Sequence, residues 1–297
     1  MATARERTVF LHIGLGKTGT SYLQRYFQFN RLMLRQCGLV YPDAQDSISG
    51  NGHLLTQFFL QSKTNPEVIT NLDLSSDCYF FSKEHFAREL SDPVHCGQFI
   101  DFLHCLGFSR IHVMLFVRNP TDHCYSLWAQ KVKATDEARS LRCFSSGYDS
   151  LRIATKCLQN LVSLRCDVKV LNYSLVSSNI LAHMHEWLVL GCPNDTSKNL
   201  SLFFRSVGSR NVAHESTNVT PNAALLAIKR LLNRYGLARQ GKSLLKTMSW
   251  CKGGKLNEPH KQLYSSNALS AFQEDIDSFS RSIRQCDLDH EHIRVEL

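Results

Sequence analysis

Four short runs of hydrophobic residues stand out along the chain and predict buried β-strands. They lie at Val9–Ile13, Cys78–Ser82, Ile111–Val117 and Val168–Asn172. Each run is short and mainly apolar, which is typical of strands covered on both faces in a parallel sheet.

Helical patterns fill the spaces between these strands. Apolar residues recur at helical spacing over six segments, at about 20–36, 53–62, 94–107, 120–133, 148–165 and 178–190. Strands that alternate with helices predict an α/β fold in which a parallel sheet carries helices on both faces. The ligand site of such a sheet lies at the carboxyl ends of its strands.

The last third of the chain has a less regular pattern. Residues 191–220 are rich in glycine, proline and asparagine, and we expect them to form a loop region. Thr220–Pro221 then opens an expected helix over 222–235, because proline suits the first helical position. A polar stretch follows at 236–262, and the last helix is expected at about 267–284. No segment reads as a linker, so we expect a single domain over residues 1–297.

Composition narrows the class of protein. The chain has 297 residues, of which 43% are hydrophobic and 20% charged, as in soluble globular proteins. No apolar stretch approaches the ~18 residues that suggest a membrane span. The amino terminus lacks the apolar region of a signal peptide, so we expect a cytoplasmic protein.

Charge and cysteine usage point to anionic partners and away from metals. The formal net charge of +8 favours phosphates, sulfates or acidic glycans. Basic residues are spread along the chain rather than gathered in one run, which argues against nucleic acid. The 11 cysteines are scattered and include no Cys-x-x-Cys pair, so no metal site is expected.

The segment HIGLGKTGTSYLQ, residues 12–24, directly follows the first predicted strand and predicts an anion-binding loop. Its glycines let the backbone come close to a ligand, and the N-terminal amides of the following helix point into the loop. The candidate binding residues are Gly16, Lys17, Thr18, Gly19, Thr20 and Ser21. The loop fits only the end of the nucleotide-binding pattern G-x-x-x-x-G-K-[ST], because leucine occupies position 11.

A second motif, VRNPTDHCYSLWAQ, follows the third predicted strand. It places Arg118 at the carboxyl end of the strand and Ser126 on the helix behind it. Arginine offers a fork of donors that suits phosphate oxygens, so the two side chains could hold one phosphate. A kinase would instead need an aspartate here to hold magnesium, and the sequence has none.

Together the two motifs resemble those of sulfotransferases that use 3′-phosphoadenosine-5′-phosphosulfate (PAPS), in particular the bacterial and glycan-type branch. GLGKTGTSYLQ is similar to the 5′-phosphosulfate loop, and VRNPTDHCYSLWAQ to the 3′-phosphate motif. The resemblance implies a P-loop-like fold, PAPS as co-substrate and 3′,5′-adenosine bisphosphate (PAP) as product.

The resemblance also implies a role for each matching position. The residues from Lys17 to Ser21 would hold the phosphosulfate, and Lys17 would stabilise charge on the leaving oxygen. Arg118 and Ser126 would bind the 3′-phosphate. A weaker match at RSVGSRNVAHESTNVTP adds Arg210 to the nucleotide site.

Transfer to a hydroxyl also needs a general base near the strand ends. His53 lies at a predicted helix start, and its role could equally be to cap that helix. Glu84 follows the second strand, where the family commonly carries a Ser-x-Glu segment. It could instead stabilise a helix N-terminus or pair with Lys17 or Arg118.

We therefore expect a PAPS-dependent sulfotransferase that acts on a hydroxyl, or an amine, of a small molecule or glycan. Two alternatives stay open: a P-loop kinase or nucleotide hydrolase, and a nucleotide-binding module without turnover. The sequence does not name the acceptor.

Overall fold

The computed structural model of the protein describes residues 6–43, 50–62, 74–135, 137–207, 223–234 and 258–286. Its contacts divide the chain into two compact units. The first contains the sheet and the helices around it. The chain leaves the first unit at Asn119 and enters it again at Leu151. Later segments of the chain belong to the second unit as well. The expectation of a single domain stays a prediction.

The first unit is built on five parallel strands in the order β2-β3-β1-β4-β5. Their bounds are β1 Arg7–Gly14, β2 Leu39–Val40, β3 Cys78–Glu84, β4 Phe108–Val117 and β5 Asp167–Asn172. The four predicted strands are confirmed. The sequence does not predict β2, because a strand of two residues leaves no periodic pattern.

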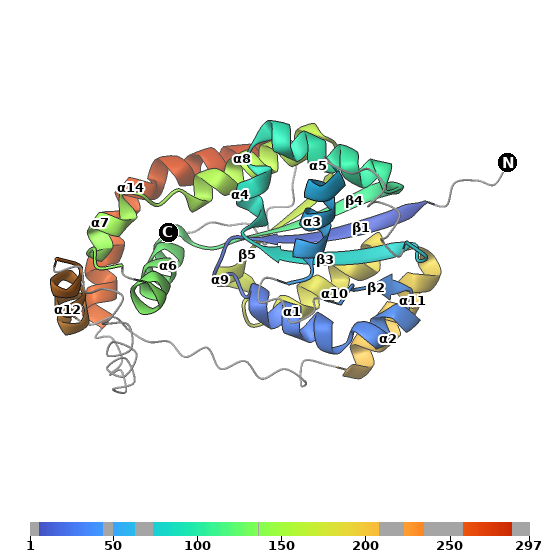
Figure 1. The fold of residues 1–297 in the computed structure, drawn as a ribbon, viewed down its shortest axis with the longest axis horizontal. Coiled ribbons are helices and arrows are strands. Elements are labelled where there is room, and N and C mark those ends of the chain that lie inside the picture. Colours follow the sequence, from blue (N-terminus) through green and yellow to red (C-terminus); the bar gives the residue numbers. More distant parts are fainter. Residues whose placement is uncertain are drawn as a thin grey trace. The chain divides into compact units, whose positions relative to one another are not determined.

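Helices cover both faces of this sheet, which confirms the predicted α/β class (Figure 1). One face carries α3 (Gly52–Ser62), α4 (Phe86–Leu90), α5 (Pro93–Cys105) and α8 (Ser150–Ser163). The other carries α1 (Thr20–Phe29), α2 (Arg31–Gln36), α10 (Ile180–Gly191) and α11 (Asn194–Val207). The short helix α9 (Tyr173–Val176) directly follows β5.

Two helix predictions for this unit differ from the structure. The helix expected at 20–36 is divided at Asn30, whose side chain donates to the carbonyl of Tyr26. The loop expected at 191–220 is wrong over α11, which buries Leu200, Phe203 and Phe204. The first half of α11 is polar, and its buried residues all lie from Leu200 onward. The apolar positions therefore span too few turns to show a helical period. Residues 208–222 lie outside the described residues.

The second unit is helical in its described residues. It contains α6 (Pro120–Ala134), α7 (Leu141–Ser145) and α12 (Ala223–Arg234), and α14 (Glu258–Gln285) belongs to it as far as Asp277. The helices expected at 120–133 and 222–235 are thereby confirmed. The last helix begins earlier than expected, and most of the polar stretch at 236–262 lies outside the described residues.

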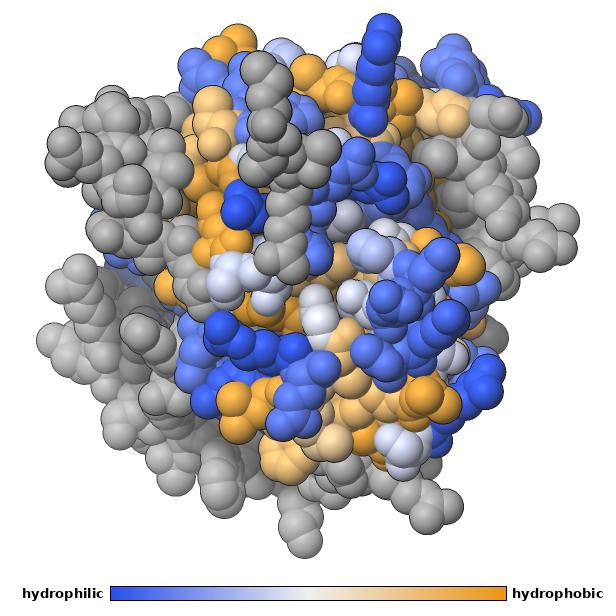
Figure 2. Space-filling view, turned by 90° about the vertical axis from the view of Figure 1, so that its right-hand side faces the viewer, coloured by the Kyte–Doolittle hydropathy of each residue, from blue (hydrophilic) through white to orange (hydrophobic). Residues whose placement is uncertain are grey.

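The main core of the first unit lies between the sheet and the helices α1, α10 and α11. Phe10, Tyr26, Phe27, Phe80 and Trp187 are all buried there. At the amino ends of the strands, hydrophilic and hydrophobic residues are interspersed over the surface (Figure 2). Among the described helices, none has the length and the apolar character needed to cross a lipid bilayer.

Candidate active site

The candidate site lies at the carboxyl end of the sheet, where four parallel strands finish almost level. Gly14 at the end of β1 is in register with Glu84 on β3 and with Phe116 on β4. Val117 on β4 is in register with Asn172 on β5. The segments after these strands therefore meet at one edge, as in other open α/β sheets.

Two residues of the loop between β1 and α1 have a left-handed backbone conformation. Lys17 has a φ of 67° and Gly19 a φ of 76°. Glycine takes this conformation without strain, whereas a residue with a Cβ such as Lys17 loses roughly 1–2 kcal/mol by adopting it. Strain of this kind persists only where surrounding contacts over-determine it, and it is concentrated at ligand sites.

The loop exposes donors to an anion. In the part of the chain that the structure describes, the backbone N–H groups of Lys17, Thr18 and Gly19 have no acceptor. The first turn of α1 adds the N–H groups of Thr20 and Ser21, which likewise have no acceptor among the described residues. The Lys17 ammonium is partly exposed and has no carboxylate partner within the described residues. This arrangement of amides and one cation suits a phosphate or sulfate.

Two of the loop hydroxyls point into the protein. The Thr18 hydroxyl donates to the carbonyl of Leu15 at 2.6 Å and lies 3.3 Å from the Thr20 hydroxyl. Both threonines are buried, while Ser21 is exposed. Thr18 and Thr20 therefore brace the loop, and their expected contact with a bound anion stays a prediction.

Glu84 and His85 lie directly against the loop at Gly16. A Cβ on Gly16 would lie 2.5 Å from Cε1 of His85 and 3.2 Å from Oε1 of Glu84, so both side chains approach the backbone of the loop closely. The backbone N–H of His85 donates to the carbonyl of Gly14 at 2.9 Å, and His85 has a left-handed φ of 65°. The structure thus brings the candidate base Glu84 to the loop that the sequence predicts to bind an anion.

The segment before α3 is bound to the edge of β3. Asn51 is fully buried, and its side chain donates to the carbonyl of Phe80 at 2.9 Å and accepts from the N–H of Ser82 at 2.8 Å. A Cβ on Gly52 would lie 2.7 Å from Cβ of Lys83. These contacts place His53, the next residue, near the carboxyl end of β3.

One nitrogen of His53 is available for proton transfer. Its Nδ1 lies 2.6 Å from the carbonyl oxygen of Gly50. Because a carbonyl oxygen only accepts, the neutral ring carries its proton on Nδ1, and Nε2 keeps a lone pair. The imidazole is oriented and partly exposed, as a general base requires.

Arg118 contacts the loop from the end of β4. Its Nη1 donates to the carbonyl of Lys17 at 3.1 Å, and its Cζ lies 5.6 Å from the centre of the Tyr173 ring. Ser126, its expected partner at the 3′-phosphate, is a partly buried residue of α6 in the second unit. Arg210 lies outside the described residues. The roles of Ser126 and Arg210 therefore stay predictions.

His12 is a residue of this region that the sequence analysis does not find. Its ring is fully buried, with Nδ1 2.8 Å from the Ser82 hydroxyl, and no described residue pairs with Nε2. Burial lowers the pKa of His12 to about 3, so the ring is neutral at pH 7. Alternation along β1 marks its side chain as facing away from Leu11, but no local pattern identifies its partner, 70 positions away.

Tyr173 is the second residue that the sequence analysis does not find. It follows β5 directly, and its ring lies so close to Gly19 that a Cβ there would be 2.6 Å from Cε2 of the tyrosine. The signal that identifies Arg118, a polar side chain at a strand end, would have identified Tyr173 as well.

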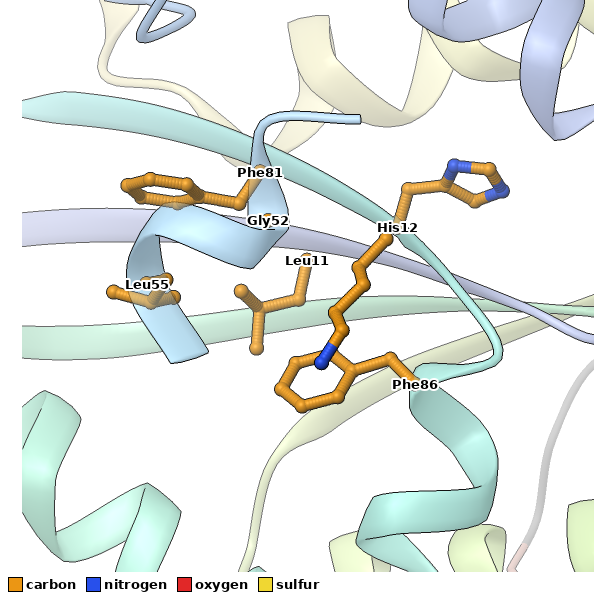
Figure 3. Close-up of a pocket in the computed structure, with 7 residues that line it drawn as sticks. Leu11, His12, Gly52, Leu55, Phe81 and Phe86 are labelled. Atoms are coloured by element: carbon orange, nitrogen blue, oxygen red, sulfur yellow. The ribbon is translucent and has the colours of Figure 1, made fainter. Parts of the chain in front are cut away.

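A small pocket beside β1 is not a ligand site. Figure 3 shows it among Leu11, Leu55, Phe81 and Phe86, with the ring of His12 turned away from these apolar side chains. It has no room for a water molecule. It lies between the sheet and the helices α3 and α4, which contribute Leu55 and Phe86.

Comparisons with known proteins give little further information. No protein-family model matches the chain, and no curated protein matches it. Among solved structures, the chain is similar to the sulfotransferase domain from the curacin biosynthetic pathway. That match covers 89% of this chain and 98% of the other, with 11% sequence identity and a TM-score of 0.36. A likeness this distant carries no functional argument.

Proposed function

We propose that this protein is a sulfotransferase that transfers a sulfuryl group from PAPS to a hydroxyl group of a small molecule or glycan. The observation that carries the proposal is the contact between two strand ends. The turn at Lys17, whose amides have no acceptor within the described part of the chain, receives a hydrogen bond from Arg118, and Glu84 lies on the other side of the same loop.

The nucleotide would be held at both of its charged ends. The amides from Lys17 to Ser21 would bind the 5′-phosphosulfate, as a helix N-terminus binds other anions. Arg118 has donors left after its bond to Lys17, and these would bind the 3′-phosphate together with Ser126 and Arg210. The 3′-phosphate is the group that distinguishes PAPS from ATP.

Transfer would need two further groups. As the sulfur leaves the bridging oxygen, negative charge develops on the departing PAP, and the Lys17 ammonium would stabilise it. At the same time the acceptor hydroxyl attacks sulfur and loses its proton to a base. Glu84 and His53 are the two candidates, and both lie at the carboxyl end of β3.

A second candidate function, a magnesium-dependent kinase or nucleotide hydrolase, has one observation in its favour. Glu84 ends the strand next to β1 and lies beside Gly16, where a carboxylate could hold magnesium against a nucleotide. The hydroxyl that would join it, on Thr18, is buried and donates to Leu15. Because this hydroxyl is already buried and bonded, it is poorly placed to bind magnesium, which favours the sulfotransferase.

The test is a calorimetric titration of the purified protein with PAP, and with ATP in the presence and absence of magnesium. Tight binding of PAP without metal, together with weak binding of ATP, is expected. Magnesium-dependent binding of ATP would refute the proposal in favour of the kinase. If PAP binds but no hydroxyl acceptor is sulfated from PAPS, the protein is a binding module.

A further inference from the structure

We propose that Tyr173 is a positioning residue, which acts with Arg118 to hold the turn from Lys17 to Gly19 in the conformation that receives the anion. This inference rests on the proposed function for its ligand. The geometry that carries it belongs to the ligand-free protein, and all of its residues lie in the first unit.

The turn needs support from outside itself. Two of its three residues, Lys17 and Gly19, have left-handed backbones, and one of these has a side chain. Within the described residues, the N–H groups of the turn bond to no acceptor. Besides the bond of the Thr18 hydroxyl to the Leu15 carbonyl, the contacts that hold the turn come from the ends of other strands.

The first of these contacts comes from Arg118. Its Nη1 donates to the Lys17 carbonyl at 3.1 Å, which fixes the peptide plane between Lys17 and Thr18. A charged donor makes this bond stronger than a neutral one. The orientation of that peptide decides where the N–H of Thr18 points, so Arg118 aims an anion donor.

The second contact comes from Tyr173, which lies against the turn at Gly19 and beside Arg118. Its ring packs on Gly19, where a Cβ would be 2.6 Å from Cε2, and it lies 5.6 Å from Cζ of Arg118. An aromatic ring attracts a guanidinium at such a distance. One side chain thus limits the movement of Gly19 and of the arginine that holds Lys17.

The position of Tyr173 is itself fixed. Asn172, the residue before it, is fully buried and accepts a hydrogen bond from the N–H of Ser174 at 3.0 Å, which caps α9. The ring therefore projects from the rigid end of β5 rather than from a long loop. The Nε of Arg118 is buried and has no partner among the described residues, so the ring and the Lys17 carbonyl are the contacts that orient this guanidinium.

The test compares Tyr173→Leu, which removes the ring, with Tyr173→Phe, which keeps it. Leu175→Ala is the matched control, because Leu175 is an exposed residue of the same short helix. Amide hydrogen exchange of the ligand-free protein is followed in peptides that cover residues 14–24. The reporters are the N–H groups of Leu15, Tyr22 and Leu23, which have acceptors and lose protection when the turn loosens. We expect exchange there to be at least tenfold faster in Tyr173→Leu, and unchanged in Tyr173→Phe and in the control.

Calorimetry with adenosine-5′-phosphosulfate and with PAP then links the turn to binding. Tyr173→Leu is expected to weaken both about tenfold, because both place a 5′-phosphate group on the turn, and Tyr173→Phe is expected to bind as the wild type does. Unchanged exchange in Tyr173→Leu would overturn the inference. A loss confined to PAP would also overturn it, because the residue would then act on the 3′-phosphate.

The inference and the proposed function fail differently. If the wild-type protein binds neither nucleotide but Tyr173→Leu still loosens residues 14–24, the support of the turn stands and the proposed ligand is wrong. If Tyr173→Leu does not fold, Arg118→Lys provides the same exchange test. It keeps the charge but loses the planar guanidinium, and unchanged exchange in residues 14–24 would overturn the inference.

Discussion

The buried histidine on β1 makes the stability of the protein depend on pH in a way that can be calculated. Burial lowers the pKa of His12 to about 3 in the folded protein, while an ordinary histidine in the unfolded chain has a pKa near 6.5. Below pH 6.5 the unfolded chain therefore binds a proton that the folded protein does not. The stability that comes from keeping His12 neutral is fully present above pH 6.5. It is lost progressively as the pH falls towards 3.

The size of this loss follows from the difference between the two pKa values. Each pH unit between them lowers the free energy of unfolding by about 1.4 kcal/mol. At pH 5 protonation of His12 in the unfolded chain therefore lowers the free energy of unfolding by about 2 kcal/mol. This is a large share of the roughly 5–15 kcal/mol that stabilises a typical domain. Burial also lowers the pKa of His185, to about 4, so His185 acts in the same direction.

The assay is urea unfolding of the wild type and of His12→Asn at pH 7, 6 and 5. The asparagine can still bond to Ser82, and between pH 7 and pH 5 the free energy of unfolding of this variant should fall by about 2 kcal/mol less than that of the wild type. His85→Asn is the control, since its side chain is 63% exposed. Equal pH dependence in wild type and His12→Asn, or an NMR titration of the His12 ring above pH 5, would refute the reasoning.

The remaining predictions concern the loop and its neighbours. Lys17→Ala should abolish sulfuryl transfer with the melting temperature nearly unchanged, and wild-type turnover would remove its assigned role. Of Glu84→Gln and His53→Ala, the variant that lacks the true base should lose turnover of at least a hundredfold with PAP affinity retained; if neither loses turnover, both assignments are wrong. Gly50→Ala should lower the free energy of unfolding by about 2 kcal/mol or more, because Gly50 has a φ of 83° and a Cβ would lie 2.4 Å from a β3 carbonyl. Gly97→Ala, inside α5 with nothing within 4 Å, is its control, and an equal shift of the urea midpoint in both would contradict the steric argument.

The sequence predicts those parts of the fold and site that depend on neighbouring residues. Buried strands show as apolar runs, and the loop from Gly14 to Ser21 shows through its glycines and lysine. Arg118 and Glu84 are found because each ends or follows a strand, and parallel strands bring such positions to one edge.

The parts that the sequence does not predict depend on contacts between distant residues. His12 pairs with Ser82 across two strands, and Tyr173 packs on Gly19 from more than 150 positions away. The inward rotation of the Thr18 hydroxyl depends on the backbone of the loop, which no residue pattern specifies. The helix α11 lacks a strong pattern because its buried residues occupy only its second half.

The pairing of Asn51 with β3 also has a consequence for solubility. The strand β2 pairs with Cys78 and Tyr79, and no other described strand pairs with the rest of that edge of β3. Asn51 closes it with one side-chain amide that bonds the carbonyl of Phe80 and the N–H of Ser82, as a neighbouring strand would. An open strand edge pairs readily with the edge of another molecule. Loss of this single amide would therefore favour self-association of the chain as well as displacement of His53.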